Sequence, residues 1–130
     1  HLITSIPGSS GWYKGTIVSY ANEIKENVLG VNDQTLRSVG AVSEDTVKQM
    51  VKGVLDRLNT DYAVATSGIM GPDGGTAEKP VGTVWVAAGS RNAIKAKQFF
   101  FRYDRERNIE MTAYQALNLL RIMVIEEQRD

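Results

Sequence analysis

The chain has no cysteine and a single histidine, His1, among its 130 residues. The absence of cysteine excludes disulfides, thiolate catalysis and cysteine zinc sites. A lone histidine leaves no basis for a histidine triad or a histidine metal cluster. Chemistry at the site must therefore rest on other side chains, and we expect neither a bound metal nor a cofactor.

Excess charge and long apolar runs are also missing. Lysine plus arginine equals aspartate plus glutamate at 15 each, which argues against a nucleic-acid partner bound through a broad basic surface. No apolar run approaches the roughly 18 residues of a transmembrane helix, so we expect a cytoplasmic protein with no membrane partner. The length and the 42% apolar content fit one domain over residues 1–130.

Apolar periodicity predicts alternating strands and helices. Strands are expected at 16–20, 62–66, 83–88 and 93–103, and helices at 1–6, 21–29, 32–38, 44–58 and 105–127. Residues 1–6 carry no helix-start signal, so we interpret them as the last turns of a helix that begins upstream. Because two strands are apolar on both faces, we predict an α/β fold, a three-layer α/β/α sandwich with a mostly parallel or mixed central sheet.

The final predicted helix carries both an apolar stripe and a charged head. The breadth of the stripe suggests packing on two neighbours or a homodimer interface, and one side of it consists of Ile109, Ala113, Ala116, Leu117, Leu120 and Val124. At the head, Arg105 or Arg107 could hold a phosphate, because backbone amides at a helix start already favour anions. A solvated run of charges is the alternative reading of these arginines.

A glycine-rich loop between two predicted strands is the strongest local signal for a ligand site. Its residues 66–76 read Thr-Ser-Gly-Ile-Met-Gly-Pro-Asp-Gly-Gly-Thr, and Lys-Pro-Val-Gly follows at 79–82. Glycines let backbone amides approach a ligand closely. The loop is neither a nucleotide P-loop nor a dinucleotide fingerprint. A phosphate cradle and a purely structural loop both remain open at this point.

Tyr20 and Lys25 stand where a predicted strand ends and a helix begins. Ligands of α/β sheets bind beyond the carboxyl ends of strands, so these two side chains could share one site. A lysine with a lowered pKa beside a tyrosine hydroxyl can act as a general base without histidine. The alternative is a tyrosine at a strand end and a solvated lysine on a helix.

Six segments, taken together, resemble the C-terminal domain of the CinA family (competence/damage-inducible protein A). They occur in the family's order at residues 2–10, 18–25, 29–31, 40–44, 67–75 and 79–84, and they cover nearly the whole chain. Stand-alone versions of that domain are nicotinamide-nucleotide amidases. The resemblance therefore implies hydrolysis of nicotinamide mononucleotide, a small-molecule pyridine nucleotide, to nicotinic acid mononucleotide and ammonia.

The resemblance also implies a mechanism of acyl transfer to a serine. The family's serine lies in a Glu-Ser-Cys-Thr-Gly-Gly motif that would fall upstream of His1, so the 130 residues alone are expected to be inactive. Tyr20 and Lys25 match the tyrosine and lysine that assist this serine, and either could be the base. The substrate-binding residues implied are Asn22, Gly68, Gly71, Gly74, Gly75 and Arg105.

Some positions depart from the family pattern. Ala21 replaces a serine, and Tyr103 replaces the glycine that usually precedes Asp-Arg. A further family arginine is absent near 109–111, so its phosphate contact could pass to Arg107. The alternative function is a non-catalytic nucleotide-binding or regulatory domain, and the presence or absence of the upstream serine would decide between the two.

Overall fold

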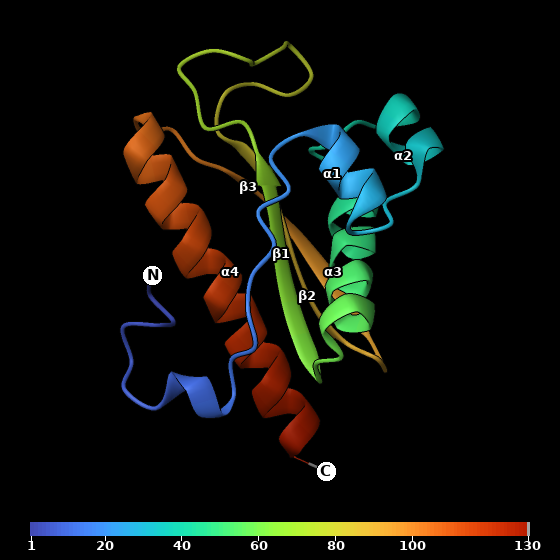
Figure 1. Ribbon diagram of the computed structural model, residues 1–130. Helices are drawn as coiled ribbons and strands as arrows, with labels where there is room; N and C mark the ends of the chain where they lie inside the picture. Colours follow the sequence, from blue (N-terminus) through green and yellow to red (C-terminus); the bar gives the residue numbers. More distant parts are fainter. Residues whose placement is uncertain (130) are drawn as a thin grey trace.

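The computed structural model describes residues 1–129 (Figure 1). From residue 22 onward, the helices and strands lie within a few residues of the positions that the periodicity predicts. In chain order the elements are η1 (Ser9–Gly11), α1 (Asn22–Asn27), α2 (Asp33–Ser38), α3 (Glu44–Leu58), β1 (Tyr62–Gly68), β2 (Thr83–Ser90), β3 (Ile94–Phe100) and α4 (Arg105–Gln128).

The three strands form one antiparallel sheet in the order β1-β2-β3. Val64 pairs with Ala88 across β1 and β2, and Ala87 pairs with Ala96 across β2 and β3. The prediction of a mostly parallel or mixed sheet is therefore wrong. The turn at 91–93 is too short for the crossover that a parallel β2–β3 pair would need, and the 69–82 connection between β1 and β2 holds no helix to form one.

Helices cover both faces of this sheet, with α3 on one side and α4 on the other (Figure 1). The α/β class is thus confirmed. The α3 side holds the larger cluster of buried side chains, Leu29, Val31, Val47, Met50, Val51, Leu55, Ala63, Ala65 and Ala87. The α4 side holds Val84, Val86, Phe101 and Ala116. Because β2 lies between the two layers, both of its faces are buried, which explains its continuous apolar run.

The first twenty residues contain neither the helix nor the strand that the sequence predicts. Residues 1–6 form hydrogen-bonded turns, including one from the Ser5 amide to the His1 carbonyl oxygen at 2.9 Å. Pro7 follows at once, so too few residues are available to propagate an α-helix. Residues 16–20 are extended, but they join no ladder of the sheet. Their β-branched side chains favour extended backbone, yet Val18 is 80% exposed.

Helix α3 contacts the chain segment that follows α1. Ser43 caps α3 as predicted, accepting a hydrogen bond from the Thr46 amide at 3.2 Å. Gly53 then faces the end of α1, where a Cβ atom would overlap the Leu29 carbonyl group. The glycine thus allows the backbone of α3 to touch that of Leu29, two residues after α1 ends.

The buried side of α4 is centred on polar residues, which the apolar stripe does not predict. Asn108 and Thr112 are buried, whereas Ile109 is 49% exposed. The polar pair is buried because its hydrogen bonds are satisfied internally, with the Thr112 hydroxyl donating to the Asn108 carbonyl oxygen at 2.7 Å. In the described part of the chain, no helix is both long enough and apolar enough to span a bilayer.

Candidate functional site

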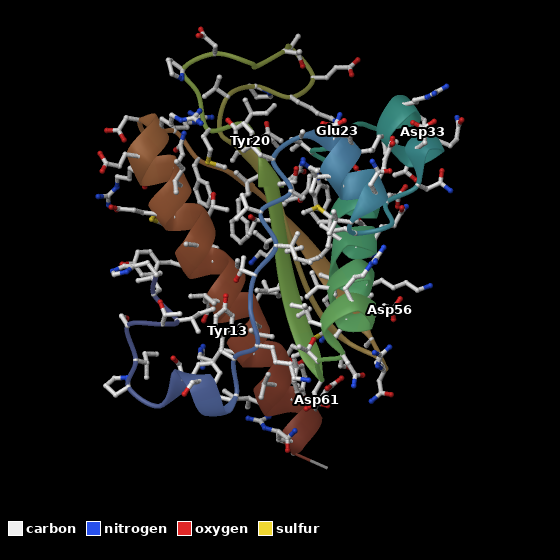
Figure 2. The ribbon with its side chains drawn as sticks, in the orientation of Figure 1. Tyr13, Tyr20, Glu23, Asp33, Asp56 and Asp61 are labelled. Carbon is white, nitrogen blue, oxygen red and sulfur yellow. The ribbon has the colours of Figure 1, made fainter. Side chains whose placement is uncertain are left out.

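The residues singled out by the sequence gather at one end of the sheet. The glycine-rich loop leaves β1 at this end, and the start of α1 and the head of α4 lie beside it (Figure 1). Figure 2 shows Tyr20 and Glu23 at this end, while Asp61 lies at the opposite one. Segments far apart in sequence are thus brought to one place by the antiparallel sheet and its two covering helices.

Lys25 is buried, with only 6% of its surface exposed. Its Nζ donates a hydrogen bond to the Ser19 carbonyl oxygen at 2.6 Å, and within the described residues no carboxylate forms an ion pair with it. Burial lowers the pKa of Lys25 below its usual 10.5, because the charged form loses solvation. The side chain is therefore closer to the neutral, proton-accepting form that a general base needs.

Tyr20 follows Ser19, whose carbonyl oxygen accepts the hydrogen bond from Lys25. Tyr20 itself is 84% exposed. Its hydroxyl is 3.5 Å from Nη2 of Arg105, at the outer limit of a hydrogen bond. The same guanidinium donates from Nη1 to the Gly71 carbonyl oxygen at 2.8 Å. Arg105 thus connects Tyr20 to the glycine-rich loop, although sequence reasoning expected it to hold substrate.

The loop glycines have identifiable packing roles. At Gly71 the backbone φ is +90°, and a Cβ would lie 2.5 Å from Cγ1 of Val81. A Cβ at Gly75 would lie 2.6 Å from the Val81 amide nitrogen, and one at Gly68 would press on neighbouring side chains. Gly74 also has a positive φ, of +97°, but more space. The loop is therefore folded tightly onto Val81, and ligand contact by these glycines stays a prediction.

Two residues that tie the loop to the rest of the site were not predicted. Asn108 of α4 donates from Nδ2 to the Met70 carbonyl oxygen at 2.9 Å. At the far end of the loop, the Lys79 ammonium donates to the Val39 carbonyl oxygen between α2 and α3. Asn108 lies outside the predicted apolar stripe, so the sequence offered no signal for its burial. Asn22, by contrast, is exposed at the start of α1, and its substrate contact stays a prediction.

Two shallow hollows, of about 310 and 380 Å³, lie at the opposite end of the sheet around Arg91 and Asn92. Glu127 there accepts a hydrogen bond from the Ser90 hydroxyl at 2.6 Å, and this bond lowers the pKa of Glu127. Arg91 is paired with Asp56 at 3.0 Å. Because these charged groups already hold partners, the hollows are weaker candidates for a functional site than the end of the sheet with Lys25.

Comparison with known proteins agrees with the family that the motifs suggest. A family model described as the CinA C-terminal domain matches residues 1–124. A CinA-like protein of Thermosipho melanesiensis is 54% identical over 90% of this chain, which spans only 30% of that relative. A protein of Enterobacter agglomerans named nicotinamide-nucleotide amidohydrolase PncC is 50% identical over 80% of this chain and 64% of its own length.

Solved structures share the fold. The competence/damage inducible protein CihA from Agrobacterium tumefaciens superposes with a TM-score of 0.87 at 40% identity, covering 90% of this chain and 72% of its own. A competence damage-inducible protein A from Klebsiella pneumoniae gives a TM-score of 0.87 at 35% identity, over 91% of this chain and 73% of its own. The chain therefore belongs to the CinA C-terminal domain family.

Proposed function

We propose that this domain hydrolyses the amide of nicotinamide mononucleotide, with Lys25 and Tyr20 moving the proton of a serine nucleophile. The observation that carries the proposal is the buried Lys25 ammonium, held at 2.6 Å by the Ser19 carbonyl oxygen with a lowered pKa. A buried amine without a carboxylate partner is costly, and such groups cluster at functional sites. The name of the Enterobacter agglomerans relative supports the choice of reaction.

In the proposed reaction, the serine comes from a segment that the family places ahead of residue 1. Its Oγ attacks the amide carbon as the neutral Lys25 Nζ, directly or through the Tyr20 hydroxyl, takes the Oγ proton. The carbon–nitrogen bond then breaks, and the same proton is returned to the departing nitrogen, which leaves as ammonia. Water hydrolyses the acyl-serine with the same base, giving the carboxylic acid and restoring the serine.

The substrate's phosphate is proposed to lie near Arg105. Two of this side chain's five N–H donors face the Gly71 carbonyl oxygen and the Tyr20 hydroxyl. Donors therefore remain for a phosphate, which guanidinium groups bind well. We place Asn22 and the glycine-rich loop around the rest of the nucleotide.

Ammonia release from nicotinamide mononucleotide tests this function. Two polypeptides are compared, the 130-residue chain and the same chain joined to the family's upstream segment with its serine. We expect turnover only in the longer one, and binding of the mononucleotide by both in calorimetry. Binding without turnover in either polypeptide would instead identify a nucleotide-binding or regulatory domain, and the absence of both would reject a nucleotide site.

A further inference from the structure

Asn108 is completely buried at the head of α4, and both ends of its amide are used. Its Nδ2 donates to the Met70 carbonyl oxygen at 2.9 Å, and its Oδ1 accepts from the Tyr103 amide at 3.1 Å. An amide side chain is needed here because one end must donate and the other must accept. Aspartate would place an oxygen against the Met70 carbonyl, and leucine would leave both backbone groups without partners.

Two consecutive carbonyl groups of the glycine-rich loop are thereby held by one helix. Asn108 takes the Met70 carbonyl, and Arg105, one turn earlier on α4, takes the Gly71 carbonyl at 2.8 Å. Residues three apart on a helix share a face, so the two donors reach adjacent positions of the loop. The orientation of the Met70–Gly71 peptide is therefore set by α4.

This orientation determines where the Gly71 amide points. The peptide between Met70 and Gly71 is trans, so its N–H is directed opposite to its carbonyl group, away from Asn108. Gly71 is buried, and its N–H has no hydrogen-bond partner among the residues that the structure describes. Buried backbone donors are nearly always paired, so an unpaired one suggests a ligand contact.

The Gly71 residue lies beside the candidate site. Arg105 reaches the Gly71 carbonyl with one amino group and the Tyr20 hydroxyl with the other. Gly71 and Tyr20 therefore lie within the span of one guanidinium group. A Cβ at position 71 would lie 2.5 Å from Cγ1 of Val81, so glycine lets the loop backbone pack against Val81 at this point.

We infer that Asn108 is a positioning residue that presents the Gly71 N–H to an oxygen atom of the substrate bound beside Tyr20. The oxygen belongs either to the amide carbonyl, whose charge grows during the reaction, or to the phosphate. A fixed backbone donor stabilises both without reorganisation. The inference rests on the proposed function for the identity of the substrate, but the geometry of the donor does not depend on the reaction.

Nuclear magnetic resonance of the ¹⁵N-labelled chain tests the donor directly. Three probes are titrated separately: nicotinamide mononucleotide, nicotinamide riboside, which lacks the phosphate, and inorganic phosphate. We expect a downfield shift of the Gly71 amide proton with the mononucleotide. A matching shift with the riboside assigns the donor to the carbonyl, and one with phosphate assigns it to the phosphate. A Gly71 signal unmoved in all three titrations overturns the inference.

The same spectra keep this inference apart from the proposed function. Signals of Tyr20 and Lys25 that move with the mononucleotide support a nucleotide site, whatever Gly71 does. If they move and Gly71 does not, the donor assignment fails while the function stands. If Gly71 moves with phosphate and the signals of Lys25 do not respond to the mononucleotide, the donor stands and the function fails.

A pair of variants tests the role of Asn108. Asn108→Asp keeps the shape but removes the donor to Met70, and we expect roughly tenfold weaker binding of the probe that moves Gly71. Thr112→Val is the matched control. It removes a buried hydroxyl that donates to the main-chain carbonyl of Asn108, and it leaves the side-chain amide of Asn108 with both of its partners. Equal binding and an equal Gly71 response in Asn108→Asp would overturn the role. If that variant does not fold, the wild-type titrations decide the donor.

Discussion

The Lys25 ammonium donates to the Ser19 carbonyl oxygen at 2.6 Å, which ties the middle of α1 to the extended segment that precedes it. A neutral carbonyl compensates a buried charge less well than a carboxylate would. The contact therefore positions the lysine while leaving its pKa low. This combination of fixed position and weak compensation is what a general base requires.

The first prediction concerns pH. Because burial lowers the pKa of Lys25 in the folded state, the unfolded chain binds more protons between that lowered value and 10.5. The Lys25 contribution to the free energy of unfolding should therefore rise as pH increases through this window. Lys25→Met removes the titrating group. Circular dichroism gives the melting temperature of Lys25→Met minus that of wild type at each pH. We expect this difference to be highest at neutral pH and to fall toward pH 10.5.

Lys52→Met is the control for that experiment, since Lys52 is exposed on α3. It reports how the loss of one exposed lysine charge changes the melting temperature over the same pH range. If the difference between Lys25→Met and wild type follows pH in the same way as that of Lys52→Met, burial does not distinguish Lys25 and the basis for its role is lost.

A second prediction concerns the contact of α3 with the segment that follows α1. Gly53→Ala should gain up to about 1 kcal/mol of helix propensity at an exposed position. In this protein, however, a Cβ at Gly53 would overlap the Leu29 carbonyl. We expect a net loss of roughly 2 kcal/mol in the free energy of unfolding, as for other overpacked sites. Urea denaturation measures it, and a variant more stable than wild type would show that the Leu29 carbonyl group does not lie against Gly53.

The loop base provides a third prediction. A Cβ at Gly82 would collide with the Phe101 carbonyl group, whereas Gly30, with a φ of +72°, has open space around it. Both positions have positive φ, so alanine should cost each about 1 kcal/mol from backbone strain. Gly82→Ala should cost at least about 2 kcal/mol more from the clash. Comparable losses in the two variants would indicate that β2 and β3 do not close as described.

Arg105 provides a fourth prediction. Arg105→Lys keeps the charge but cannot reach the Gly71 carbonyl and the Tyr20 hydroxyl together, because an ammonium is a single point of donation. We expect roughly tenfold weaker binding of nicotinamide mononucleotide in calorimetry. Arg107→Lys is the comparison, since Arg107 lies over the Tyr103 ring and has no hydrogen bond to the loop. Unchanged affinity in Arg105→Lys with a loss in Arg107→Lys would move the phosphate contact to Arg107.

Local signals predicted the elements of this fold better than their arrangement. The Ser43 cap and the amphipathic pattern of α3 depend on neighbouring residues, and both are confirmed. The direction of strand pairing depends on distant segments, and that prediction is wrong. The burial of Lys25 and Asn108 likewise arises from tertiary packing, because residue type alone predicts exposure for both.

The position of the candidate site in the fold could be predicted in part. Tyr20, Lys25 and Arg105 were selected from spacing and family resemblance, and the fold brings them to one end of the sheet. The loop contacts of Asn108 and Lys79 were not predicted, since each joins the loop to a residue more than thirty positions away. Such contacts leave no trace in local composition.

The most direct test of the central claim is ammonia release from nicotinamide mononucleotide by the polypeptide that includes the family's upstream serine. Wild type and Lys52→Met should release ammonia and nicotinic acid mononucleotide at the same rate. Lys25→Met should bind the mononucleotide but lose at least about a hundredfold in turnover, the usual contribution of a general base. Full turnover by Lys25→Met would contradict the proposed role of this lysine.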